Sequence, residues 1–170
     1  MFGLISTLSI GDAENLNFDD ASFDHVCSWG VLHHSPDTPK AIDEVCHVLK
    51  KGGTASIMIY NKWSIVGMML WLRYTLLIGR PFRSFQDVYA NHLESPGTKA
   101  YSYTQARELF SKFSHISISS PLTHGDLLES DVGQKHRGSF LSIAKLIWRR
   151  WLIKRVLPNA GLFMMVKLRK

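Results

Sequence analysis

The 170-residue sequence contains only two cysteines, Cys27 and Cys46, and no CxxC pair. Two isolated thiols cannot build the disulfide framework of a small secreted protein. A zinc site drawn from these cysteines, His47 and the His33-His34 pair would lack the paired spacing of structural zinc ligands. Because no signal-peptide pattern precedes them, we expect two reduced core thiols, no bound metal and a cytoplasmic protein.

The sequence also lacks Gly/Ser linkers, repeats and long apolar runs. Its most apolar segment, residues 63–78, carries one charge, Arg73, and falls short of the roughly 18–20 residues that span a bilayer. We expect a lid helix there, within a block of inserted helices at residues 61–114; an interfacial membrane helix is the alternative. With 45% hydrophobic residues, the chain predicts one domain over residues 1–170.

Positive charge is nearly absent from the first third of the chain. Residues 1–60 hold three lysines and eight acidic residues, whereas residues 61–170 carry a net charge of +11. This distribution argues against a surface that coats nucleic acid, and it leaves open an anionic substrate or a membrane surface near the basic tail. Basic residues are scattered around a helix expected at 139–157, which favours a packed helix over a membrane-peripheral one.

The clearest structural pattern is a βαβ unit. Residues 23–29 alternate as in a strand, and residues 54–60 are nearly all apolar, as in a strand covered on both faces. Between them, Thr38 is the expected N-cap, Pro39 opens a helix, and Gly52-Gly53 is expected to stop it. Such a unit is almost always right-handed.

Other elements follow from similar signals. Met1 to Leu4 reads as the end of a helix and Ile5 to Ile10 as a brief strand. A helix is expected from a cap at Ser102 or Thr104 to Phe113. Strands are expected at residues 115–122 and 161–168.

Four motifs in the stretch from Gly11 to Tyr60 occur in a distinctive order: GDAENLNF, SFDHVCS, VLHH and VLKKGG. This stretch of about fifty residues resembles class I S-adenosylmethionine-dependent methyltransferases of the methyltransferase type 11 family. Two departures are visible, because Asn17 and Lys51 stand where proline is usual in that family.

The resemblance implies an α/β fold with a Rossmann-like sheet of order 3-2-1-4-5-7-6, whose last strand is antiparallel. This chain matches strands three to seven. The family's glycine-rich GxGxG turn and its acidic ribose-binding strand end are not found in the 170 residues. We therefore expect a truncated domain in which residues 23–29 form a sheet edge and residues 5–10 either pair with that edge or stay detached.

The resemblance also implies S-adenosylmethionine as cofactor. Asp12 and the amide of Ala13 would bind its adenine. Glu14 would either form hydrogen bonds that support these residues or be exposed to solvent. Ser28, Trp29 and Gly30 would lie beside the methyl group. Gly30 would permit close approach of an acceptor, and Trp29 would either form a wall of the acceptor site or simply be packed.

Histidines supply the candidates for acid–base chemistry. His34, and less so His33, would act as general base, and we expect adjacent side chains to point in different directions so that at most one faces the acceptor. His124 and Asp126 follow a strand expected to end at the ligand crevice and are candidate substrate-binding residues, or parts of an ordinary turn.

The predicted function is methyl transfer to a small-molecule or lipid-like acceptor, impaired in this chain. The alternative is a non-catalytic module, derived from a methyltransferase domain, that binds a membrane or a partner protein. A dinucleotide-binding enzyme is disfavoured because no GxGxxG occurs.

Overall fold

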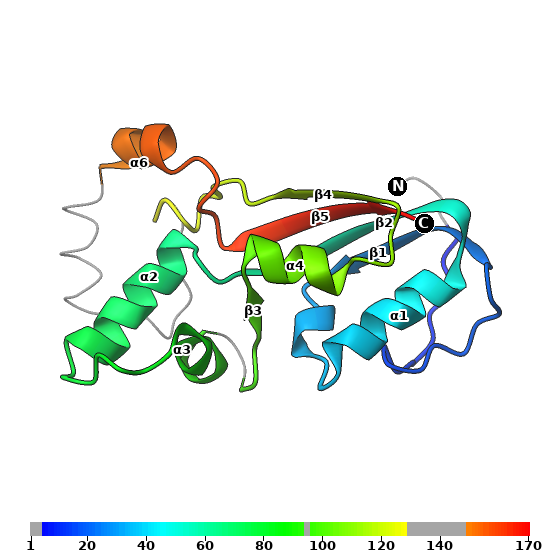
Figure 1. Cartoon of the computed structure of the whole chain (residues 1–170), viewed down its shortest axis with the longest axis horizontal. Coiled ribbons are helices and arrows are strands. Elements are labelled where there is room, and N and C mark those ends of the chain that lie inside the picture. The colour runs from blue at the N-terminus through cyan, green and yellow to red at the C-terminus, as the bar shows by residue number, and fades with distance from the viewer. Residues whose placement is uncertain (1–4, 94–95, 129–148) are drawn as a thin grey trace.

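The computed structural model describes residues 5–93, 96–128 and 149–170. Its centre is a five-stranded mixed sheet whose main path has the order β1-β2-β5-β4 (Figure 1). Strands β1 (Phe23–Trp29) and β2 (Leu49–Asn61) are parallel. Strand β5 (Phe163–Arg169) lies antiparallel between β2 and β4 (His115–Ser119). This is the predicted order 4-5-7-6 with an antiparallel last strand, so that expectation is confirmed.

Helix α1 (Thr38–Val48) joins the two parallel strands. Its N-cap is Asp37, whose carboxylate accepts a hydrogen bond from the Lys40 amide at 3.1 Å, and not Thr38 as the sequence suggested. The Thr38 hydroxyl instead donates to the Ser35 carbonyl. Either side chain can cap a helix, and the register of the turn decides between them.

Gly52-Gly53 does not stop α1, contrary to the expectation. The helix ends at Val48 and the chain enters β2 directly at Leu49. Pairing of β1 with β2 jumps from Phe23–Leu49 to His25–Thr54, so the intervening residues form an irregularity in β2. Gly52 adopts φ +78° there, a conformation that glycine enters without steric penalty.

Helices cover one face of the sheet. Figure 1 shows α1 and α4 (Tyr103–Leu109) in front of the strands. Ser102 caps α4, and its hydroxyl pairs with Gln105 in a capping box, as the sequence allowed. Their apolar sides pack against alternate strand residues in the main core, which includes Ile42, Val45, Ile57, Phe110 and Val166. Helix α4, expected among the lid helices, is therefore part of the sheet's covering layer.

The other face of the sheet divides into two parts. Toward the carboxyl end of β2, Met58 and Tyr60 pack in a second apolar cluster with residues of the helical segments that follow. Toward the opposite end, a shallow depression is lined by polar residues such as His25, Ser56 and Lys167. Lys167 and His25 are exposed, so this part of the sheet faces solvent within the described structure.

Three helical segments follow β2. Helix α2 (Ile65–Trp71) continues into a π-helical turn, η2 (Leu72–Leu76), and α3 (Phe85–His92) packs beside α2. The helix expected at 63–78 is thus shorter and changes its winding. A two-residue strand, β3 (Ala100–Tyr101), then joins the end of β2 in parallel. None of the described helices is long and apolar enough to cross a membrane.

Two sequence expectations fall partly or wholly outside the described residues. The helix predicted at 140–157 is described only as α6 (Arg150–Val156), and Met1 to Leu4 lies outside the described ranges. The strand expected at Ile5–Ile10 is wrong, because this segment has no regular structure and its Ile5 and Ile10 side chains are fully exposed. Of the two outcomes considered, the segment stays detached and β1 is an edge of the sheet.

Candidate active site

The candidate site lies where β1 and β2 end, the edge at which open α/β sheets bind their ligands. The tip Ser28–Gly30 leads into the short helix η1 (Leu32–His34), and the acidic turn Asp12–Asn15 contacts the loop that follows η1. Each part comes from a loop that a neighbouring strand or helix holds in place.

The acidic turn is closed by its own side chain. The Asp12 carboxylate accepts a hydrogen bond from the Glu14 amide at 2.9 Å, and the Asn15 amide donates to the Asp12 carbonyl at 3.1 Å. This is the local hydrogen bonding for which Asp is favoured in turns. Asp12 remains exposed, so its carboxylate is accessible to a ligand.

Glu14 fastens this turn to the loop after η1. Its carboxylate accepts hydrogen bonds from the Ser35 hydroxyl and from the Asp37 amide, the latter at 2.8 Å. These two donors stabilise the charged form and lower the pKa of Glu14, with the Ser35 hydroxyl as the larger cause. Nearby, the Leu16 amide donates to Glu44 of α1 at 2.8 Å. These contacts hold the turn against α1 and the loop that precedes it.

The tip of β1 combines a buried hydroxyl with an exposed ring. The Ser28 Oγ is buried and has no hydrogen-bond partner among the described residues, whereas Trp29 is 61% exposed. Gly30 adopts φ +71°, and an added Cβ would meet the Met58 side chain at 3.4 Å. The positive φ favours glycine here, whereas the 3.4 Å contact would be an ordinary one.

His33 is fully buried, and neither ring nitrogen has a hydrogen-bond partner among the described residues. Burial lowers its pKa to about 4, with a smaller contribution from the neighbouring His34. The ring is therefore neutral at physiological pH. A buried imidazole with such a low pKa is a weak base, so His33 is the poorer of the two candidates.

His34 is half-buried, and its Nδ1 lies 3.4 Å from the Thr98 hydroxyl. The two histidine side chains diverge less than expected: their ring centroids are 4.2 Å apart, and both rings approach Tyr60 at the end of β2. Of the two rings, His33 is buried and only His34 is partly exposed.

Two residues that hold the loop after η1 in place were not predicted from the sequence: Lys99, just before β3, and Tyr60 of β2. The Lys99 ammonium donates to the carbonyls of Ser35 and Pro36 at 2.8 and 2.7 Å. The Tyr60 ring lies 4.3 Å from that of His33. Lys99 is more than 60 residues from its partners and no motif marks it, so only the fold could identify it.

His124 and Asp126 lie elsewhere. Asp126 is buried, and its carboxylate accepts hydrogen bonds from the Thr123 amide and hydroxyl and from the Leu162 amide, at 2.8, 2.7 and 2.8 Å. It thus fixes a turn to the start of β5. His124 is exposed in a separate hollow with Lys154 and Pro158. The contacts support the ordinary-turn alternative for Asp126, and no described contact links either residue to the histidine pair.

The cysteines and histidines of the described residues do not form a metal site. Among the described ranges, no group of three or more potential ligands is close enough to hold an ion. Cys27 and Cys46 are free thiols.

The methyltransferase domain family model matches residues 3–57, which is the stretch that contains the acidic turn and the histidine pair. The chain is similar to phosphoethanolamine N-methyltransferase 2 of Caenorhabditis elegans, at 43% identity over 54 residues, 32% of this chain and 12% of that protein. It is also similar to a ubiquinone/menaquinone biosynthesis C-methyltransferase of Laribacter hongkongensis, at 37% identity over 60 residues, 35% of this chain and 25% of that protein.

Solved structures extend the likeness to nearly the whole chain. A SAM-dependent methyltransferase from Thermotoga maritima superposes with a TM-score of 0.60 at 18% identity, covering 94% of this chain and 62% of its own. A SAM-dependent methyltransferase from Archaeoglobus fulgidus gives a TM-score of 0.55 at 11% identity, covering 94% and 66%. At these identities the likeness establishes the fold alone.

The chain spans at most a quarter of the two curated relatives it matches. The sequence match and the fold nevertheless agree with each other, since residues 3–57 build the site end of the sheet. Family and fold together imply S-adenosylmethionine as the cofactor. The chain thus has the fold of class I S-adenosylmethionine-dependent methyltransferases, and its residues 3–57 match the methyltransferase domain family.

Proposed function

We propose that this chain forms the adenine and methyl side of the cofactor site of a methyltransferase that acts on a small-molecule or lipid-like acceptor. The observation that carries the proposal is the position of the acidic turn. Glu14 bonds to Ser35 and Asp37, which ties the turn containing Asp12 to the loop that follows the Ser28–Gly30 tip and η1.

The acidic turn fits an adenine ring. An adenine offers an exocyclic amine that donates hydrogen bonds and ring nitrogens that accept them. The exposed Asp12 carboxylate would accept from the amine, and the half-buried Ala13 would supply its amide. Glu14 acts as a positioning residue, because its carboxylate is engaged by Ser35 and Asp37.

The tip of β1 fits the other end of the cofactor. The buried, unpartnered Ser28 hydroxyl is a group that a bound molecule would satisfy, since buried polar atoms are rarely left without a partner. Gly30 leaves room for close approach, and the exposed Trp29 ring would form a wall of the acceptor site.

When bound, the cofactor supplies an electrophilic methyl group for an in-line displacement. The protein's part is to orient the acceptor and, where the acceptor carries a proton, to take it up. His34 is the residue for that step: it is half-buried and lies against Thr98. His33 would support it through ring contact, since its own low pKa makes it a poor base.

Two observations support the acceptor class. The names of the matched relatives refer to phosphoethanolamine, a small polar amine, and to ubiquinone and menaquinone, which carry lipid-like tails. The helices after β2 also surround the site end of the sheet with apolar side chains.

The 170 residues contain no glycine-rich turn for the remainder of the cofactor. Each missing hydrogen bond to a bound ligand costs about 1–3 kcal/mol when its polar partner loses water without replacement. We therefore expect this chain alone to bind S-adenosylmethionine more weakly than micromolar and to show impaired transfer.

Nuclear magnetic resonance can detect such weak binding. On titration with S-adenosylmethionine, and separately with adenosine, we expect amide shifts at residues 12–14 with both ligands and at residues 28–30 only with the methyl donor. Asp12→Ala should abolish the shifts at the turn, whereas Asp19→Ala, an exposed acid on the same loop, should preserve them. Absence of shifts at the turn with the wild-type chain would refute the proposal.

The alternative is a non-catalytic module that binds a membrane or a partner protein. It predicts no shifts in the acidic turn at any ligand concentration and no transfer of label from methyl-labelled cofactor to amine or quinol acceptors. The titration therefore distinguishes the two functions.

A further inference from the structure

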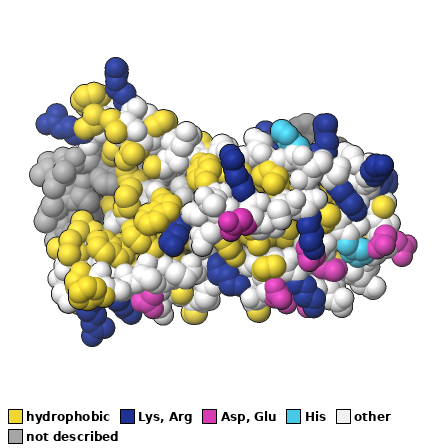
Figure 2. All heavy atoms as spheres, in the orientation of Figure 1, with side chains coloured by type: hydrophobic (Ala, Val, Ile, Leu, Met, Phe, Trp, Pro, Cys, Tyr) yellow, Lys and Arg dark blue, Asp and Glu magenta, His cyan; other side chains and the backbone are white. Residues whose placement is uncertain are grey.

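Large apolar side chains are exposed at one end of the molecule. They belong to two parts of the chain that are far apart in sequence: the turn after η2 and helix α6. Phe82 is 100% exposed, and Leu77, Ile78 and Trp151 are each more than half exposed. Figure 2 shows hydrophobic side chains gathered over α2 and α6, with Lys and Arg at the margins.

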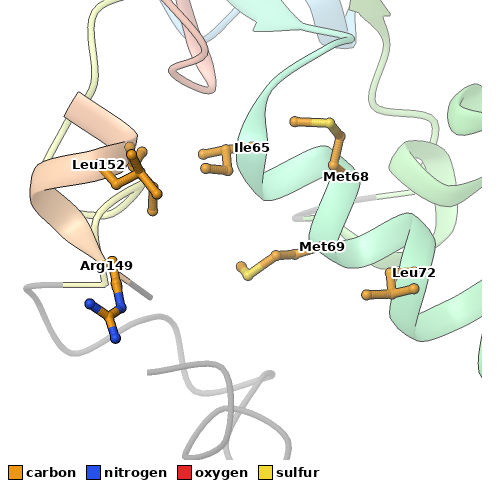
Figure 3. Close-up of a pocket in the computed structure, with 7 residues that line it drawn as sticks. Ile65, Met68, Met69, Leu72, Arg149 and Leu152 are labelled. Carbon is orange, nitrogen blue, oxygen red and sulfur yellow. The ribbon is translucent and has the colours of Figure 1, made fainter. Parts of the chain in front are cut away.

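An apolar groove lies beside these side chains, between α2 and α6. It has a volume of about 420 Å³, and Figure 3 shows its walls: side chains of α2 and η2 face Leu152 of α6, with Arg149 at one end. The lining residues are Ile65, Met68, Met69, Leu72, Leu152 and Ile153, together with Arg149. The opposite side of α2, including Leu70, packs in the second apolar cluster, so the groove is separated from the candidate active site.

Most of the charges in the described segments around this surface are positive. Residues 61–86 contain four Lys or Arg and no acid, and residues 149–161 contain four and no acid. Arg83 is paired with Asp87, and Arg150 is held by the Leu127 carbonyl, but Arg80, Arg149 and Arg155 are exposed. A surface of this kind is complementary to one that is both apolar and anionic.

We propose that the surface formed by residues 76–82, the groove and α6 docks onto an anionic lipid bilayer. Leu77, Ile78 and Phe82 would enter the boundary between headgroups and acyl chains, as apolar side chains of interfacial segments do. Trp151 would lie at the headgroup level, and the exposed arginines would contact lipid phosphates. The groove would accept part of an acyl chain.

This proposal does not depend on methyl transfer, because the docking surface contains none of the residues assigned to the cofactor site. It would bring the chain to a membrane, where a lipid-like acceptor would be concentrated.

Vesicle sedimentation tests the proposal with the 170-residue chain. We expect binding to vesicles of phosphatidylcholine mixed with phosphatidylglycerol, little binding to phosphatidylcholine alone, and weaker binding at high salt. Leu77→Asp combined with Phe82→Asp should reduce the partition coefficient by about tenfold or more. Arg80→Gln combined with Arg155→Gln should reduce it roughly fivefold per arginine at low salt.

Two matched controls lie in the acidic part of the chain. Leu8→Asp changes an equally exposed apolar residue, and Lys51→Gln removes an exposed cation; both should leave binding unchanged. Because all substituted side chains are exposed, circular dichroism should show unaltered folding in every variant.

Three results would overturn the proposal. The first is failure of the wild-type chain to bind the mixed vesicles, and the second is an equal loss of binding in the Leu8→Asp control. The third is that the wild-type chain forms a dimer and binds no vesicles, while the Leu77→Asp/Phe82→Asp variant is a monomer. The last result would assign this surface to a second copy of the chain.

Discussion

His33 shows how burial changes the chemistry of one residue. Its imidazole has no exposed surface and contacts the rings of His34 and Tyr60. Removing the ring from water disfavours its charged form, which lowers the pKa from 6.5 to about 4. The VLHH motif suggested a general base, but one of its two histidines, His33, mainly packs against neighbouring rings.

This shift predicts a pH-dependent stability. Between the folded pKa of about 4 and the unfolded value of 6.5, the unfolded chain binds a proton at His33 that the folded chain does not. The contribution is thus fully present above the unfolded pKa and declines as pH falls, by about 1.4 kcal/mol per pH unit in this window. Urea unfolding of the wild type and of His33→Gln from neutral to mildly acidic pH should show the steeper decline in the wild type. Parallel curves would contradict the assignment.

At the scale of elements, α2 and α3 are joined by a buried polar contact. The Tyr89 hydroxyl of α3 bonds to the Ser64 hydroxyl that caps α2, at 2.8 Å, and donates to the Asn61 carbonyl at 2.9 Å. Gly67 lies against this hydroxyl so closely that an added Cβ would be 1.9 Å from it. The two helices can pack in this way only because α2 has a glycine there.

Gly67→Ala should therefore destabilise the packing of α2 on α3. Overpacking of this kind typically costs about 1–3 kcal/mol, measured here as a lower midpoint of urea unfolding. Tyr89→Phe in the Gly67→Ala background should recover only part of the loss, because the ring carbon Cζ would still lie 2.6 Å from the new methyl group. Gly11→Ala is the matched control, since its Cβ would meet nothing within 4 Å. An unchanged midpoint for Gly67→Ala would contradict the observed packing.

At the scale of the whole molecule, the two faces of the sheet differ. One is covered by α1 and α4, while part of the other is lined by His, Ser, Thr and Lys side chains. Sheets with parallel strands are usually covered on both faces and read as apolar runs. Here β1 is also an edge, so its outward groups are open to solvent.

The reactivity of the two cysteine thiols can test this difference between the faces of the sheet. Cys27 of β1 is exposed, whereas Cys46 of α1 is half-buried against the core. With a thiol reagent such as Ellman's reagent, we expect Cys27 to react several-fold faster than Cys46 in the native chain, because the core partly covers Cys46. Cys27→Ser and Cys46→Ser assign the two phases. Equal protection of both thiols would show that the exposed sheet face is covered in solution.

The strands and helices around β1 and β2 could be predicted from sequence because their signals are local, whereas the order of the strands in the sheet was implied by the family resemblance. Apolar alternation, the Ser102 cap and the motif order from Gly11 to Tyr60 act within a few residues of each other. The same holds for the acidic turn, whose central contact joins Asp12 to Glu14.

Only the tertiary structure decided which residues share a site. Lys99 reaches Ser35 and Pro36 across more than 60 residues, the two histidines face the same ring, and Asp126 is engaged by the start of β5 instead of the site. The tertiary structure also decided that Ile5–Ile10 forms no strand, because a strand needs a neighbouring strand to pair with as well as an apolar pattern. The sequence determined the elements since their causes are local, while the contacts between distant loops depend on how the whole sheet brings its carboxyl ends together.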